Sequence, residues 1–292
     1  MKGSRTQKSL TNTVVSFASQ LIVILLGFLS RRVLIYSVGV EYLGINGLMS
    51  NILTIFSLAE SGIGLAIGFA LYKPLAENDI EQVKSLMRFF KYTYRALAIG
   101  TAAIGVAFYP LLPFFLKDNT APDANLVYWL FLLGSVSSYL WVHKTTLNTS
   151  DQNKYLYTIA STIAQIVVLV LKVLILYFAQ NYILYLAVDI GTTIVKNLIF
   201  CRIVDRRYPY LKDKNVRKLD PEVRKSLFTN IKALFLGKVG YIISQCSDNL
   251  VISSLVSVTA VGMYSNYTTL ITSVSGFVTT FSSGVTASMG NL

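Results

Sequence analysis

The stretch TNTVVSFASQLIVILLGFLSRRVLIYSV, residues 11–38, is an apolar run of 28 residues in which Arg31 and Arg32 are the only charged side chains. A helix needs about 20 predominantly apolar residues to cross a bilayer, and more when it is tilted. The run is therefore long enough for one transmembrane helix. It follows basic residues, but it is too long for the apolar part of a signal peptide and lacks a small-residue cleavage site, so we expect it to be retained.

Seven further apolar runs follow, so we expect about eight transmembrane helices. The chain is 53% hydrophobic and only 14% charged, whereas a typical soluble domain is roughly 25% charged. The sequence thus predicts an all-α integral membrane protein, a polytopic helical bundle, and excludes a disordered chain. The seven runs cover residues 44–72, 92–116, 126–141, 155–178, 183–203, 231–256 and 262–286.

The basic residues predict the orientation of these helices. With a cytoplasmic N-terminus, the cytoplasmic loops hold most of the 26 Lys and Arg residues, and the exterior loops hold only Lys117. Cytoplasmic loops of membrane proteins carry such an excess of Lys and Arg. The net charge of +12 therefore reflects topology and attraction to anionic lipid. The basic segment 202–232 lacks the aromatic interleaving typical of base stacking, so we expect no nucleic-acid partner.

A weak internal repeat predicts two lobes. A shift of 218 residues places YSVGVEYLGINGLMSNIL over SLVSVTAVGMYSNYTTLI and pairs Gly44 with Gly262. Six helices separate the two copies, so both copies would have the same orientation in the membrane, as a parallel repeat. We expect a first six-helix bundle at 1–203, a basic cytoplasmic linker at 204–230, and the first two helices of a second bundle at 231–292. On this expectation the second bundle is incomplete and the chain is truncated at its C-terminus.

Eight ionisable residues inside the expected helices are the candidate functional residues. An ionised side chain at the centre of a membrane helix costs about 2.5–3.5 kcal/mol on insertion scales, so it usually faces protein or a water-filled cavity. The cations are candidates for binding an anionic substrate, and the acids are candidates for ion coupling. The cations are Arg31, Arg32, Lys172, Lys196 and Lys238, and the acids are Glu60, Asp189 and Asp248.

Depth along each helix, counted at about 1.5 Å per residue, divides these charges into two layers. The outer layer includes Arg32, Lys172, Asp189 and Asp248, and the deeper layer consists of Glu60, Lys196 and Lys238. Arg32 and Asp248 match in depth near the exterior, and Glu60 and Lys238 match at a deeper level, so these are the two expected ion pairs. A pair between Arg32 and Glu60 is disfavoured because about 15 Å of depth separates them.

Helical periodicity adds a second constraint. Asp189 and Lys196 are seven residues apart and are expected on one face of their helix. Arg31 and Arg32 point about 100° apart, so we expect only one of them to face a central cavity. Lys172 and Lys196 have an alternative, because their long side chains could reach toward a membrane interface.

The residue types favour transport over catalysis. A guanidinium group can hold phosphate oxygens in a bidentate fork and a lysine acts as a point charge, whereas acids within membranes often relay protons or bind Na⁺. Cys201 and Cys246 are isolated and are interpreted as buried thiols, and His143 as a structural residue near the interface. We therefore expect no enzyme activity, no metal and no cofactor, although H⁺ or Na⁺ coupling is compatible with the acids.

Four stretches carry a resemblance to a known family: EYLGINGL (41–48), LAESGIG (58–64), LYKPLAENDI (71–80) and NLVISSLVSVTAVGMYSNYTTL (249–270). They resemble Wzx-type polysaccharide repeat-unit flippases of the multidrug/oligosaccharidyl-lipid/polysaccharide exporter superfamily. The resemblance implies a bacterial cell membrane protein that flips undecaprenyl-pyrophosphate-linked oligosaccharide to the outer leaflet by alternating access, for capsule, O-antigen or exopolysaccharide biosynthesis.

The same resemblance implies partners and site residues. The partners would be the lipid bilayer, the lipid-linked oligosaccharide, and polysaccharide polymerase and chain-length machinery. The family's cationic cavity would map onto Arg31 or Arg32, with Lys238 as a further candidate. Family members have more than eight helices, so this chain alone would be an incomplete transporter.

Two other functions stay open. A multidrug or small-solute cation antiporter of the same superfamily would depend on acids in its cavity and would tolerate loss of the arginines. A non-transporting scaffold for polysaccharide assembly would tolerate neutralisation of every charge within the membrane.

Overall fold

The computed structural model describes residues 5–56, 58–116, 123–213 and 215–289, and its account of side chains leaves out those at 5–10, 58–59, 61–62, 65, 237–238, 241–246, 277 and 280–289. All regular secondary structure in these ranges is helical, which confirms the all-α prediction. The elements are α1 (Arg5–Val38), α2 (Val40–Phe56), α3 (Leu58–Glu77), α4 (Ile80–Phe108), η1 (Tyr109–Leu111), α5 (Leu112–Phe115), α6 (Ala124–Ser150), α7 (Lys154–Phe178), α8 (Tyr182–Arg207), η2 (Pro209–Lys212), α9 (Pro221–Leu255) and α10 (Val258–Met289).

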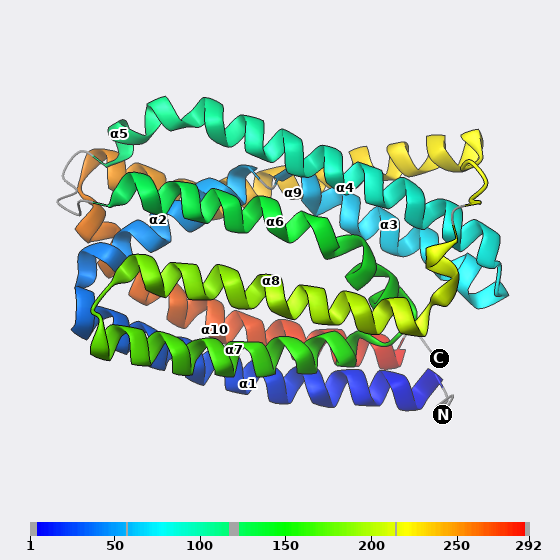
Figure 1. Ribbon diagram of the computed structural model, residues 1–292, viewed down its shortest axis with the longest axis horizontal. Helices are drawn as coiled ribbons and strands as arrows, with labels where there is room; N and C mark the ends of the chain where they lie inside the picture. The colour runs from blue at the N-terminus through cyan, green and yellow to red at the C-terminus, as the bar shows by residue number, and fades with distance from the viewer. Residues whose placement is uncertain (1–4, 57, 117–122, 214, 290–292) are drawn as a thin grey trace.

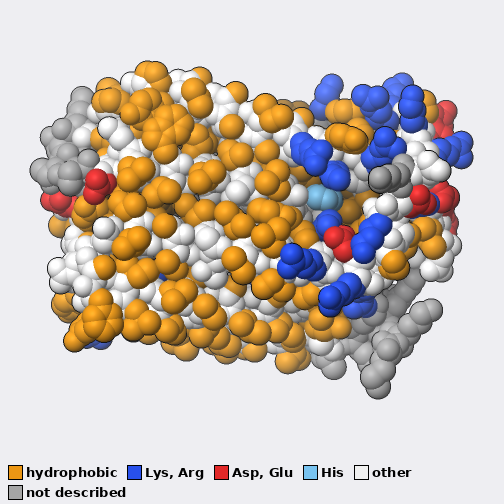
Figure 2. Space-filling model, viewed as in Figure 1, with side chains coloured by type: hydrophobic (Ala, Val, Ile, Leu, Met, Phe, Trp, Pro, Cys, Tyr) orange, Lys and Arg blue, Asp and Glu red, His pale blue; other side chains and the backbone are white. Residues whose placement is uncertain are grey.

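The long helices run side by side along the longest axis of the molecule, with the marked chain ends close together (Figure 1). The turns between α3 and α4 and between α6 and α7 lie at that same end. Lys and Arg side chains gather there, whereas hydrophobic side chains cover most of the remaining visible face (Figure 2). We call this the basic end. That these turns face the cytoplasm stays a prediction.

Five helical segments of the described ranges are long and apolar enough to cross a membrane by length and composition. The expected helix at 44–72 falls in α2 and α3, which the structure describes on either side of residue 57. The expected spans at 231–256 and 262–286 largely coincide with α9 and α10 and are not among the five. The five are Thr11–Val38, Ile80–Phe115, Ala124–Ser150, Lys154–Phe178 and Tyr182–Arg207.

The turns follow from local chemistry. Asn78 has a φ of 57°, in the left-handed region that asparagine tolerates. Asp79 then caps α4 by accepting a hydrogen bond from the Gln82 N–H at 2.9 Å. Asn181 caps α8 in the same way, accepting from the Leu184 N–H at 3.1 Å. Left-handed residues also lie at the turns after α1, α6 and α7, namely Gly39, Gln152 and Gln180.

Two apolar cores occupy the two ends of the bundle. The core of the basic end is built around α3, α4 and the second halves of α6 and α8, and it includes Leu71, Phe90, Tyr139 and Phe200. The core of the opposite end is built around α2, the first halves of α6 and α8, and the last turns of α7. The middle parts of α6 and α8 therefore lie between the two cores, and the middle of α8 carries Asp189, Thr193 and Lys196.

Helices α9 and α10 pack directly on the helices of the first bundle, α9 on α3 and α2, and α10 on α2 and α1. Helix α8 continues to Arg207 and α9 begins at Pro221, so both helices extend into the segment 204–230 that was expected as a linker. The division of the chain into two lobes stays a prediction.

Helices α2 and α10 approach closely at the two glycines that the repeat pairs. A Cβ atom on Gly262 would lie 2.7 Å from the Val40 carbonyl oxygen, and one on Gly44 would clash with the Val258 carbonyl oxygen. Val40 precedes Gly44 by four residues, as Val258 precedes Gly262, so the contact is reciprocal. Reciprocity of this kind is what a two-fold axis produces. Small residues permit such close approach between membrane helices.

We predict that Gly44→Ala and Gly262→Ala each lower the thermal stability of the detergent-purified protein, because each added methyl group meets backbone. Gly100→Ala is the matched control, since a Cβ there meets nothing within 4 Å, and alanine is favoured over glycine in a helix by about 0.5–1 kcal/mol. Equal melting temperatures for Gly44→Ala and Gly100→Ala would contradict the close crossing of α2 and α10.

Candidate functional site

Three adjoining hollows follow one face of α8 between the two cores. Their volumes are about 320 Å³ against α1 and α7, about 360 Å³ against α2 and α6, and about 430 Å³ against α3, α4, α6 and α7. Thr193 lines all three, Asp189 lines the first two, and Lys196 lines the first and third. We call these hollows the α8 cavities.

The shared face follows from helical periodicity. Residues 189, 193 and 196 are spaced i, i+4 and i+7, which places them on one side of a helix with 3.6 residues per turn. The prediction that Asp189 and Lys196 share a face is confirmed, since both line the hollow between α1, α7 and α8. Thr193 lies between these two residues on the same face, and an analysis of charged residues alone does not find it.

An ion pair joins α7 to α8 at the edge of this face. Lys172 Nζ lies 3.0 Å from Asp189 Oδ2, with the lysine side chain 11% exposed and the aspartate side chain 49% exposed. The same ammonium lies 4.2 Å from the centre of the Tyr185 ring, within the range of a cation–π interaction. The charge of Lys172 is thus compensated by a carboxylate and the face of an aromatic ring, in place of the expected alternative that its side chain reaches toward a membrane interface.

Lys196 has no such carboxylate. Its ammonium lies 3.4 Å from the Tyr157 hydroxyl and 5.2 Å from the centre of that ring, and no described Asp or Glu oxygen lies within 4.0 Å. Glu60 lines the same hollow but hydrogen-bonds Tyr139. Lys196 is therefore a cation on a cavity wall that is held only by neutral groups.

Arg31 and Arg32 have different surroundings. The half-buried Arg31 donates from Nε to Asn266 Oδ1 at 2.5 Å and from Nη1 to the Thr269 hydroxyl, so it connects α1 to α10. Arg32 is exposed, with its guanidinium carbon 5.7 Å from the centre of the Tyr36 ring. Neither arginine is among the described residues that line the α8 cavities, so the expectation that one of them faces a central cavity stays a prediction.

The pair expected between Arg32 and Asp248 is absent from the described residues. Asp248 is exposed and accepts a hydrogen bond from the Tyr264 hydroxyl at 2.7 Å. Asp248 lies on α9, whereas the helices that α1 contacts most are α7, α10 and α2. Lys238 lies on α9, but its side chain falls outside the described residues, so its pairing with Glu60 stays a prediction.

The site therefore differs from the one that depth matching indicated. Lys172 and Asp189 had the same estimated depth, yet nothing in the sequence showed that α7 packs on α8 at this level. The neutral partners Tyr157, Tyr185 and Thr193 were also missed, although the spacing of Thr193 from Asp189 is a signal that could have found it. Within the described residues, no group of three or more His, Cys, Asp or Glu side chains could hold a metal ion.

Two of three comparisons with known proteins found a similarity. The profile of a family described as polysaccharide biosynthesis protein matches residues 9–287. A solved multidrug resistance MATE family transporter of the MOP superfamily, in an inward-facing conformation, superimposes with a TM-score of 0.58 over 96% of this chain at 13% identity. The chain spans 66% of the length of that transporter. At 13% identity the similarity concerns the fold of a helical membrane protein. The comparison with curated proteins gave no match.

We predict that the Lys172–Asp189 pair couples the stabilities of α7 and α8. Lys172→Met and Asp189→Asn should each lower the melting temperature, because each leaves one charge without its partner. The double variant should lose less than the sum, with an interaction free energy on the order of 1 kcal/mol. Additive effects in this double-mutant cycle would contradict the ion pair.

Proposed function

Because the chain belongs to the polysaccharide biosynthesis protein family, we propose that it flips undecaprenyl-pyrophosphate-linked oligosaccharide repeat units from the cytoplasmic to the outer leaflet of the bacterial cell membrane. The family and the fold shared with a solved transporter support a membrane transporter. The lipid-linked substrate, the alternating-access cycle and the supply of capsule, O-antigen or exopolysaccharide are the proposed part. A cytoplasmic N-terminus, at the basic end, belongs to the same proposal.

The observation that carries this proposal is the state of Lys196. A cation in the membrane-spanning part of a protein is costly unless it is compensated. Lys196 lies on the wall of a hollow of about 430 Å³ with Tyr157 as its polar contact. A pyrophosphate group would supply the missing negative charge, and a lysine binds phosphate as a point charge. This supports an anionic substrate over a cationic one.

Arg31 supports the same substrate in a second way. Its guanidinium is held by an amide oxygen and a hydroxyl, both neutral. A phosphate group carries the opposite charge and can accept two parallel hydrogen bonds from a guanidinium, so a phosphate group entering between α1 and α10 would compete well for Arg31. Loss of that contact would loosen α10 from α1, which is the type of rearrangement that alternating access requires.

The Lys172–Asp189 pair is the proposed coupling element. Protonation of Asp189, or Na⁺ binding to it, would release Lys172 from its carboxylate at the wall of two α8 cavities. Glu60 and Asp248 are further candidates for ion coupling. In this proposal the polysaccharide polymerase and chain-length machinery receive the flipped product.

The test is deletion of the gene in its host, followed by measurement of lipid-linked repeat units in the inner leaflet and of surface polysaccharide. We predict accumulation of the first and loss of the second. The native gene should restore both. Lys196→Met should restore surface polysaccharide about tenfold less well at an equal membrane level, because it removes one charge-assisted contact.

Lys73→Met is the matched control, since Lys73 is 82% exposed at the end of α3 and its nearest carboxylate, Glu77, is 4.0 Å away. It should restore polysaccharide fully. Normal polysaccharide without accumulation in the deletion strain would contradict flipping and favour the antiporter. Full restoration by Lys196→Met would favour a scaffold in which charges within the membrane are dispensable.

A further inference from the structure

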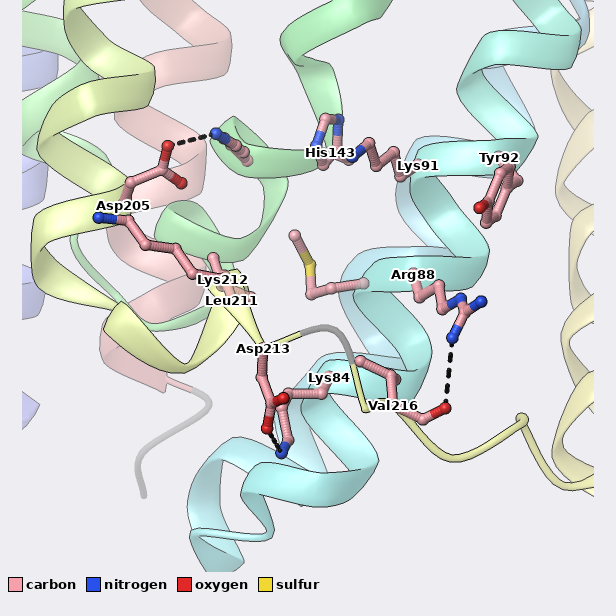
Figure 3. A pocket seen from close by; sticks show the side chains of 12 residues that line it. Lys84, Arg88, Lys91, Tyr92, His143, Asp205, Leu211, Lys212, Asp213 and Val216 are labelled. Carbon is pink, nitrogen blue, oxygen red and sulfur yellow. Dashed lines mark hydrogen bonds and ion pairs between the residues drawn. The ribbon is translucent and has the colours of Figure 1, made fainter.

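A further hollow, of about 460 Å³, lies at the basic end, outside the α8 cavities. Its walls come from α4, α6, α8 and η2 together with the segment that follows η2 (Figure 3). We call it the basic pocket. Its lining includes five cations, Lys84, Arg88, Lys91, Lys144 and Lys212, and two carboxylates, Asp205 and Asp213. No residue of the α8 cavities that carries the proposed function lines it.

The two carboxylates are already paired. Lys84 Nζ lies 2.9 Å from Asp213 Oδ2, and Lys144 Nζ lies 2.7 Å from Asp205 Oδ2. Lys84 is nearly buried, with its side chain 7% exposed, and also pairs with Glu81 at 2.5 Å. These two pairs fix α4 and α6 to the segments that close the pocket, whereas the other three cations, Arg88, Lys91 and Lys212, are exposed.

Three cations of the pocket have no carboxylate partner among the described residues. Arg88 donates from Nη1 to the Val216 carbonyl oxygen at 3.3 Å, which leaves most of its five donors unused. Lys91 and Lys212 have no carboxylate oxygen within 4.0 Å in the described ranges. The positive charge therefore exceeds the negative charge within one concave site, where the low dielectric of the walls strengthens it.

His143 provides a second and independent indication of a ligand. The side chain is buried, at 7% exposure, and its Nδ1 has no hydrogen-bond partner among the described residues. It lines the pocket next to Lys91 (Figure 3). A buried polar nitrogen without a partner carries a free-energy cost that a bound group can remove. The Nδ1–H tautomer would donate to a ligand oxygen.

We propose that the basic pocket binds a phosphate group. Arg88 supplies a planar fork that suits phosphate oxygens, Lys91 and Lys212 supply point charges, and His143 supplies a neutral donor. The volume lies in the usual range for small-molecule sites, about 300–1,000 Å³, and holds a phosphate with a small polar substituent. That phosphate comes either from the headgroup of an anionic phospholipid in the adjacent leaflet or from a soluble phosphate compound.

The test uses the full chain in nanodiscs of pure phosphatidylcholine, free of polyprenyl lipids, so that it does not depend on the proposed function. Inorganic phosphate and pyrophosphate are titrated by calorimetry in one arm. In the other arm phosphatidylglycerol replaces part of the phosphatidylcholine, and the change in melting temperature is measured. Saturable binding in the first arm identifies a soluble ligand site. Stabilisation in the second arm alone identifies a lipid headgroup site.

Arg88→Gln combined with Lys91→Gln should weaken binding about tenfold or more in whichever arm responds. Lys73→Gln combined with Lys154→Gln is the matched control, because it removes two exposed charges of the basic end outside the pocket, and it should change binding less than about twofold. Asp205→Asn should strengthen binding, because it frees Lys144 to contact the ligand.

Three results would overturn the proposal. The first is the absence of a response in both arms. The second is equal weakening by the pocket variant and the control variant, which would mean that diffuse surface charge attracts the anion. The third is unchanged binding by the Arg88→Gln, Lys91→Gln protein when its melting temperature shows that it is folded.

Discussion

The arrangement depends on one constraint: an ionised side chain within a bilayer must find an opposite charge, polar groups or water. Lys172 meets it with Asp189 and the face of Tyr185. Arg31 meets it with hydrogen-bond acceptors on α10. The contacts of Lys172 join the consecutive helices α7 and α8, and those of Arg31 join α1 to α10, so the charges position the helices as well as the site. Lys196, which has only Tyr157, is the exception, and the function we propose follows from that exception.

Hydropathy and charge predicted the helices and the basic end, because both depend on local composition. The pairing of Gly44 with Gly262 was more informative. The weak sequence repeat corresponds to the crossing of α2 and α10. At this crossing each glycine meets the backbone carbonyl of the residue that lies four positions before the other glycine, and only glycine fits there.

The candidate site was predictable in its members but not in its pairings. Counting residues from the helix ends gives depth, and depth correctly grouped Lys172 with Asp189 in one layer. It gives neither the direction of a side chain nor the identity of the neighbouring helix. Arg32 was therefore matched with Asp248, whereas Tyr264 holds Asp248. The basic pocket was missed for a similar reason, because its cations come from three separate segments and His143 was interpreted as structural.

The central claim is that the α8 face bearing Asp189, Thr193 and Lys196 is in contact with water, whereas the exposed residue Ile199 faces lipid. Single cysteines at Thr193 and Ile199, in a chain with Cys201 and Cys246 replaced by serine, distinguish the two environments. A water-soluble, membrane-impermeant maleimide is applied to native membranes opened to both sides. The account predicts that Thr193→Cys reacts at least several-fold faster than Ile199→Cys. Equal rates, or faster reaction at Ile199→Cys, would contradict it.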